Sequence, residues 1–137
     1  MTKLVFTFLL LAGLAAPALA GPAQDAQIAS YLAAAKAADP AFAGFSAERG
    51  KAFFMADHTG GKPDTPSCTS CHTNDMTKPG QTRAGKAIDP MALSRAPDRY
   101  SDPAKVEKWF GRNCNSVLGR DCTPAEKGDV LTWLVSQ

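Results

Sequence analysis

The stretch P-S-C-T-S-C-H, from Pro66 to His72, contains two cysteines separated by two residues and followed at once by a histidine. Residues i and i+3 lie on the same side of a helical turn, so the thiols of Cys68 and Cys71 face one side of the chain. This spacing is typical of covalent attachment of a c-type haem, in which both thiols bond to the vinyl groups and the histidine binds the iron. The sequence therefore predicts one haem c, attached through Cys68 and Cys71, with His72 as the fixed axial ligand.

Two other kinds of site use paired cysteines. A zinc site would need Cys114 and Cys122 as its second pair, but seven residues separate these two, whereas paired zinc ligands are usually separated by about two to four. A thioredoxin-like redox motif would need a βαβ pattern, which is missing. Haem attachment is the favoured interpretation, and a zinc-stapled binding module stays as an alternative.

The start of the chain has the pattern of an export signal. A positive Lys3 precedes an apolar run from Leu4 to Ala16, and Ala18-Leu19-Ala20 is a small-residue cleavage site. We expect a signal peptide over residues 1–20, cleaved after Ala20, and a cytochrome c domain over residues 21–137 in the periplasm. An uncleaved membrane anchor is the alternative. The apolar core is short for a spanning helix, so stable membrane insertion is not expected.

The mature chain is close to neutral. Removal of Lys3 leaves 14 of the 15 basic side chains, against 13 acidic ones. These charges are scattered, so neither nucleic acid nor an anionic membrane is expected as a partner. Export permits disulfides. Once Cys68 and Cys71 are assigned to haem, Cys114 and Cys122 are the one remaining pair of the four cysteines.

Helical periodicity and capping residues predict an all-α fold, and no segment alternates as a strand does. The predicted helices run from Ala23 to Ala38, from a Ser46 cap to about Asp57, from Asp102-Pro103 to between Gly111 and Asn113, and from the T-P-A-E capping box at Thr123 onward. The stretch from Thr73 to about Arg99 is predicted to be mostly irregular. A long irregular stretch needs something to pack on, and a buried haem supplies such a surface.

The second axial ligand separates an electron carrier from a gas-binding protein. Carriers hold the iron with a methionine or a second histidine, yet the expected late loop, Gly111 to Asp121, contains no methionine. Met91 lies far enough along the chain from His72 to reach over the haem, and His58 is the other histidine. Either ligand, Met91 more readily, would make the protein a conventional electron carrier.

The same late loop contains two asparagines. Asn113 lies next to Cys114, so a disulfide to Cys122 would restrict the loop that carries it. The ordinary role for an asparagine here is a helix C-cap, because asparagine tolerates the left-handed conformation. Asn115 is nearly as good a choice for a ligand, and spacing alone leaves these alternatives open.

Three stretches of the chain resemble the sphaeroides haem protein (SHP) family. They are G-G-K-P-D-T-P-S-C-T-S-C-H at residues 60–72, G-Q-T-R-A-G-K at 80–86, and V-E-K-W-F-G-R-N-C-N-S-V-L-G-R-D-C-T-P at 106–124. The likeness runs from about Ala47 to the C-terminus, and the N-C-N-S-V-L-G-R-D-C block is specific. The resemblance implies a monohaem cytochrome c with a class I cytochrome fold.

The resemblance also implies a ligand set and partners. Asn113 would be a labile sixth ligand to the haem iron, next to a disulfide between Cys114 and Cys122. On reduction Asn113 would leave the iron, which could then bind small diatomic ligands such as O2 or NO. A dihaem cytochrome c would be the electron donor.

Two expectations concern packing and charge. Gly50, Phe54 and Trp133 resemble the residues at which the N- and C-terminal helices cross in class I cytochromes, where glycine lets helix backbones approach closely; ordinary core packing is the alternative. Partners for the haem propionates are expected among Arg83, Arg95, Arg99, Tyr100 and Arg120.

Overall fold

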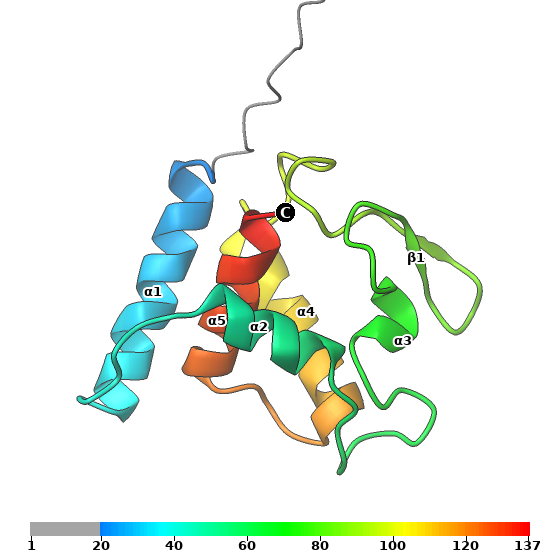
Figure 1. Cartoon of the computed structure of the whole chain (residues 1–137), viewed down its shortest axis with the longest axis horizontal. Helices are drawn as coiled ribbons and strands as arrows, with labels where there is room; N and C mark the ends of the chain where they lie inside the picture. Colours follow the sequence, from blue (N-terminus) through cyan, green and yellow to red (C-terminus); the bar gives the residue numbers. More distant parts are fainter. Residues whose placement is uncertain (1–19) are drawn as a thin grey trace, which may run out of the picture.

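The computed structural model describes residues 20–137, so the expected export signal lies, apart from Ala20, outside the described residues. The elements in chain order are α1 (Pro22–Ala38), α2 (Ala47–Met55), α3 (Thr69–His72), β1 (Gly80–Gln81), β2 (Ala87–Ile88), α4 (Pro103–Leu118) and α5 (Pro124–Val135). Figure 1 shows α1, α2, α4 and α5 on one side and α3 with β1 on the other. No helix in the described part is long and apolar enough to cross a membrane.

The all-α prediction is confirmed, with one small addition. The two short strands pair antiparallel, Gly80 opposite Ile88 and Gln81 opposite Ala87. The turn between them contains Gly85 at φ 78°, a conformation that glycine adopts without steric cost. The two strands are too short to show the alternating pattern by which strands are found in a sequence.

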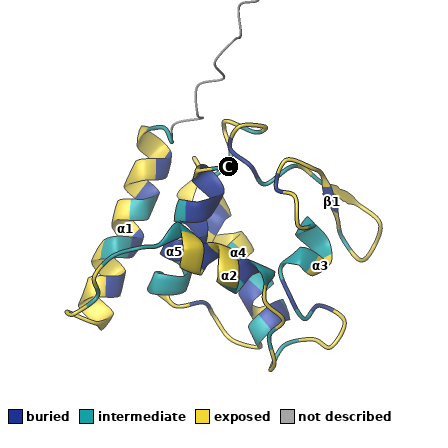
Figure 2. Ribbon diagram, viewed as in Figure 1, coloured by how far each residue is buried: buried dark blue, intermediate teal, exposed yellow. Residues whose placement is uncertain are grey.

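The core is built on α5, which is buried along most of its length (Figure 2). It crosses α2 at Gly50, where a Cβ atom would fall inside contact distance of the Asp129 carbonyl oxygen. One helical turn after Gly50, the ring of Phe54 packs edge to face against the ring of Trp133, with centroids 5.2 Å apart. The predicted helix crossing is therefore confirmed, and the glycine is needed for the close approach.

An ion pair between the exposed Arg49 and the buried Asp129 stabilises the same crossing. The Asp129 carboxylate accepts hydrogen bonds from Arg49 Nε at 2.8 Å and from the Ser46 backbone N–H at 2.7 Å. Ser46 itself caps α2 by accepting from the Arg49 N–H. The charge on Asp129 is thus neutralised and hydrogen-bonded, as a buried carboxylate requires.

The caps at the N-terminal ends of α4 and α5 are as predicted. The Asp102 side chain accepts from the Lys105 N–H at the start of α4, and Thr123 and Glu126 form the capping box of α5. The helix α2 ends at Met55, two residues before the predicted Asp57.

The predicted end of α4 is wrong, because the helix continues beyond Asn113 to Leu118. Gly119, at φ 70°, forms its left-handed C-cap and donates its N–H to the Asn115 carbonyl. Asn113 is therefore inside the helix rather than at its cap. Glycine and asparagine are poor helix formers and suggested an earlier end, but the buried side chain of Val117 keeps the last turn helical.

Residues 73–102 are mostly irregular, as predicted, and they pack on the core through a few buried side chains. Met76 and Ala92 are buried beside Phe54, and the Ala92 N–H donates to the Met76 carbonyl at 2.8 Å. The segment is thus joined internally by a backbone hydrogen bond and packs against the core at Phe54.

Candidate functional site

The cysteine motif forms a single helical turn, α3, whose N-cap is Cys68. Cys68 and Cys71 are both free thiols, partly buried. Burial raises the pKa of Cys68 to about 11, so it is a neutral thiol at physiological pH. The turn stops at Thr73, whose φ of 64° is left-handed.

Gly80 lets the strand pair approach this turn. A side chain at Gly80 would collide with the Cys71 carbonyl oxygen. The strand β1 can therefore lie directly against α3, and the G-Q-T-R-A-G-K stretch supports the cysteine motif from one side.

The imidazole of His72 is neutral and partly buried. Burial, with a smaller contribution from the nearby positive charge of Arg99, lowers the pKa of His72 to about 4. Its Nδ1 atom is buried and has no hydrogen-bond partner among the described residues. Such an orphaned buried polar atom is rare in a folded protein, and a neutral imidazole is the form that binds metals.

One cavity brings the motif together with α4. Its walls are formed by two short stretches around α3 and by one face of α4: Thr65, Ser67, Cys68, Cys71, His72, Asn113, Ser116 and Val117. Asn113 thus lies at the same cavity as both thiols and His72, although it is about forty residues away in sequence.

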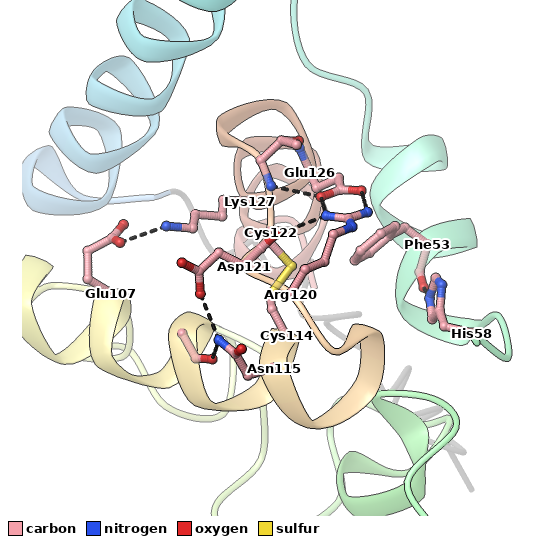
Figure 3. Close-up of a disulfide and its surroundings, with 12 residues drawn as sticks. Phe53, His58, Glu107, Cys114, Asn115, Arg120, Asp121, Cys122, Glu126 and Lys127 are labelled. Atoms are coloured by element: carbon pink, nitrogen blue, oxygen red, sulfur yellow. Dashed lines mark hydrogen bonds and ion pairs between the residues drawn. A yellow bond between two sulfur atoms is a disulfide. The ribbon is translucent and has the colours of Figure 1, made fainter. Parts of the chain in front are cut away.

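The residue after Asn113 is fixed covalently. Cys114 and Cys122 form a disulfide with their Cα atoms 5.6 Å apart, joining the last turns of α4 to the start of α5 (Figure 3). In the same figure Arg120 makes two hydrogen bonds to the Glu126 carboxylate, at 2.8 and 2.7 Å. The connection between the two helices is therefore held by a covalent bond and an ion pair.

Asn115 points to a different environment from Asn113. Its amide donates to the Gly111 carbonyl at 2.8 Å and to Asp121 Oδ1 at 2.7 Å (Figure 3). Asn115 does not line the cavity. Of the two asparagines that the sequence left open, the fold brings Asn113 to the cysteine motif.

The alternative axial ligands, Met91 and His58, do not line this cavity. The Met91 sulfur accepts a hydrogen bond from Arg99 Nη2 at 3.0 Å, and Tyr100 donates to the Met91 carbonyl at 2.6 Å. His58 Nε2 is 2.8 Å from the Phe53 carbonyl oxygen. Neither Met91 nor His58 lines the cavity.

Sequence reasoning missed the polar part of the cavity wall. Thr65 Oγ1 is 2.9 Å from Ser116 Oγ and 3.2 Å from the Ser116 carbonyl oxygen. Gly60 and Gly61 bring this loop against α4, since a Cβ on Gly61 would collide with the Ser116 carbonyl. The G-G pair at residues 60–61 was the available signal, because adjacent glycines often mark a close approach of two backbones.

Several basic residues expected near the haem propionates already have partners. Arg83 and Arg120 form ion pairs with carboxylates. Arg99 is the one whose charge reaches His72.

The donor set fits a covalently attached haem. Two free thiols lie one turn apart, and a neutral imidazole with an unpartnered nitrogen follows them. All three side chains line the same cavity. The zinc interpretation is wrong, because Cys114 and Cys122 are joined to each other. In the part of the chain that the structure describes, no three His, Cys, Asp or Glu side chains converge as a metal site.

Known sequences resemble this chain over most or all of its length. The chain is 61% identical to the cytochrome c-type protein SHP of Cereibacter sphaeroides, over the whole length of both proteins. It is 34% identical to cytochrome c'' of Methylophilus methylotrophus over 78% of this chain and 75% of that protein. Residues 40–134 match the family described as a domain of unknown function, DUF1924.

Solved structures give the same result. The structure of oxidised SHP, an oxygen-binding cytochrome c, superposes with a TM-score of 0.77 at 59% identity, covering 83% of this chain and 96% of that one. Oxidised cytochrome c'' of M. methylotrophus gives 0.70 at 32% identity, covering 84% and 94%. With its cysteine motif, its helical fold and these relatives, the chain belongs to the SHP family of monohaem cytochromes c and carries one haem c.

Proposed function

We propose that this protein is a periplasmic cytochrome whose haem iron has His72 as its fixed ligand and Asn113 as a labile sixth ligand. The observation that carries the proposal is the shared cavity: Asn113 faces it together with Cys68, Cys71 and His72. When bound, the haem supplies an iron that takes up small diatomic gases in its ferrous state.

The chemistry of Asn113 accounts for a redox-dependent bond. An amide oxygen is a neutral, hard donor, which suits the more highly charged ferric iron better than the ferrous one. A change from about 99% bound to about 1% bound needs a difference in affinity of roughly 10⁴-fold, about 5.5 kcal/mol. The disulfide at Cys114 limits how far the helix can move, so Asn113 can leave and return by small displacements.

Two relatives support this proposal. The solved SHP is described as an oxygen-binding cytochrome c, and the cytochrome c'' of M. methylotrophus has been studied for detachment of a haem ligand. We extend the binding of O2 to the reduced form of this chain, and we propose that the same iron also binds NO. We also propose a dihaem cytochrome c as its electron donor, and export through a signal peptide over residues 1–20, leaving a cytochrome c domain over residues 21–137.

Optical spectra of the holoprotein test the proposal. The reduced protein should bind carbon monoxide or nitric oxide rapidly, and its spectrum should change in the Soret region. A reduced protein that binds neither gas would overturn the proposal.

The alternative is a conventional electron carrier with Met91 as sixth ligand. The hydrogen bond from Arg99 to the Met91 sulfur argues against it. A Met91→Leu variant separates the two: we expect an unchanged ferric spectrum, whereas loss of a sulfur–iron band would establish the carrier.

A further inference from the structure

One face of α4 carries positive charge around an exposed aromatic ring. Lys105, Lys108, Trp109 and Arg112 are all exposed and follow the spacing i, i+3, i+4, i+7, so they lie on one side of the helix. We call these four residues the α4 basic face. Trp109 is 47% exposed and is the one large hydrophobic side chain left exposed in the described part of the chain.

The three cations of the α4 basic face have no ion-pair partner within residues 20–137. Glu107, the acidic residue within the sequence of α4, lies on another side of the helix. There its carboxylate accepts hydrogen bonds from Lys127 at 2.7 Å and from the Tyr31 hydroxyl. Asp89 and Asp98 share a surface recess with Lys105. The uncompensated positive charge therefore belongs mainly to Lys108 and Arg112.

The aromatic ring is held in place by one of these cations. The Arg112 guanidinium lies 5.5 Å from the centre of the Trp109 ring, within the range of a cation–π contact. Tryptophan and arginine are the residues most enriched among those that dominate binding energy at protein interfaces. A lone exposed tryptophan is ordinary, but one that shares a helix face with three cations, and contacts one of them, has the composition of a docking site.

The α4 basic face adjoins the haem site. Asn113 is four residues after Trp109 and Ser116 is four after Arg112, so both cavity-lining residues are one turn away on the same helix. A protein seated on Trp109 would therefore lie next to the stretch of α4 that lines the cavity.

We propose that the α4 basic face docks an acidic electron-donor protein that reduces the haem. This rests on the proposed function, because it assigns the surface through which the iron is reduced. One electron leaves the reduced cofactor of the donor and converts ferric to ferrous iron; no covalent bond or proton transfer is involved. A second copy of this chain would bring like charges together, which is unfavourable.

Reduction kinetics test the assignment. Reduced flavodoxin, an acidic one-electron donor, serves as the protein probe, and hydroquinone serves as a small uncharged one. In stopped-flow experiments on the ferric holoprotein we expect the rate constant with flavodoxin to fall as salt is raised, because attraction between opposite charges is screened. The double variant Lys108→Glu/Arg112→Glu should slow this reaction about tenfold or more at low salt, and leave reduction by hydroquinone unchanged.

A matched control separates this surface from net charge. Lys36 is exposed in the last turn of α1, which Figure 1 shows on the side of the molecule opposite α3. Lys36→Glu makes the same change of charge as the single variant Lys108→Glu. It should alter the rate by less than twofold, whereas Lys108→Glu should slow the flavodoxin reaction at low salt. Trp109→Ala should slow the flavodoxin reaction at high salt as well, because it removes contact area rather than charge.

The outcomes distinguish this inference from the proposed function. All variants should bind carbon monoxide as the wild type does when reduced chemically. If Lys36→Glu slowed the flavodoxin reaction as much as Lys108→Glu, or if the double variant did not slow it, the docking face would be refuted even if the reduced protein binds gases. Binding of the wild type but not the double variant to phosphatidylglycerol-containing vesicles at physiological salt would assign the face to a membrane instead.

Discussion

At the scale of single residues, the site depends on which side chains have no hydrogen-bond partner within the described part of the protein. His72 keeps a buried nitrogen without a partner, whereas His58 and the Met91 sulfur are each within hydrogen-bond distance of another residue. Asn113 faces the cavity, and Asn115 is held by two acceptors. Two asparagines of identical chemistry thus lie in different surroundings, which supports Asn113 rather than Asn115 as the proposed ligand.

Asn113→Ala tests the proposed ligand. We expect the ferric spectrum to change toward a high-spin or water-ligated form, since alanine has no donor atom, while the ferrous spectrum and carbon monoxide binding stay the same. Asn115→Ala is the matched control and should leave both oxidation states unchanged. An unaltered ferric spectrum in Asn113→Ala would eliminate the asparagine ligand.

At the scale of helices, the crossing of α2 and α5 depends on the absence of a side chain. Gly50 meets the Asp129 backbone so closely that no Cβ fits. Gly111 in α4, in contrast, has nothing within 4 Å of the position of its Cβ. Two helical glycines therefore have opposite consequences when changed to alanine.

Gly50→Ala should destabilise the protein by about 1–3 kcal/mol or more, because the backbones of α2 and α5 must move apart. Gly111→Ala should stabilise it by about 0.5–1 kcal/mol, because alanine is the better helix former. Urea unfolding of the two holoproteins measures both effects. Equal stability of the two variants would show that the crossing is not close-packed.

The connection between α4 and α5 contributes stability that depends on pH. The pKa of Glu126 lies below its ordinary value of 4.5 because Arg120 donates hydrogen bonds to it, while partial burial acts in the opposite direction. A depressed pKa in the folded state means that the contribution is present above pH 4.5 and is lost as the pH falls below it.

Glu126→Gln removes this charge, while the amide oxygen can still accept the Thr123 N–H of the capping box. We expect a loss of about 0.5–1 kcal/mol at pH 7, because the ion pair is partly exposed. The difference from wild type should shrink as the pH falls below 4.5. Denaturant unfolding at several pH values checks this, and a constant difference would assign the loss to packing.

At the scale of the whole molecule, the chain has two unequal parts. The helices α2 and α1 make their main contacts with α5, whereas α3 makes its main contacts with β1. The proposed haem anchors, Cys68 and Cys71, belong to the α3 part, and Asn113 lines the same cavity from α4. The cofactor is therefore expected to connect the two parts.

A haem-free variant tests this connection. In Cys68→Ala/Cys71→Ala protein we expect amide hydrogen exchange in residues 68–88 to accelerate at least tenfold, because this segment loses its main packing surface. Exchange in the middle of α5 should change much less, since α1 and α2 still cover it. Uniform acceleration through α5 would show instead that the haem nucleates the entire fold.

Local chemistry let the sequence alone determine the caps at the N-terminal ends of the helices, the all-α class and the one remaining cysteine pair, and it also supplies the proposed haem anchor. Each of these depends on residues a few positions apart, or on counting. The end of α4 could not be predicted, because buried Val117 and the closely packed loop at Gly61 outweigh the weak helix propensity of the intervening residues. Only the tertiary structure decided which asparagine meets the cysteine motif and which sulfur is already bound, because the direction of a side chain depends on what its helix or loop packs against.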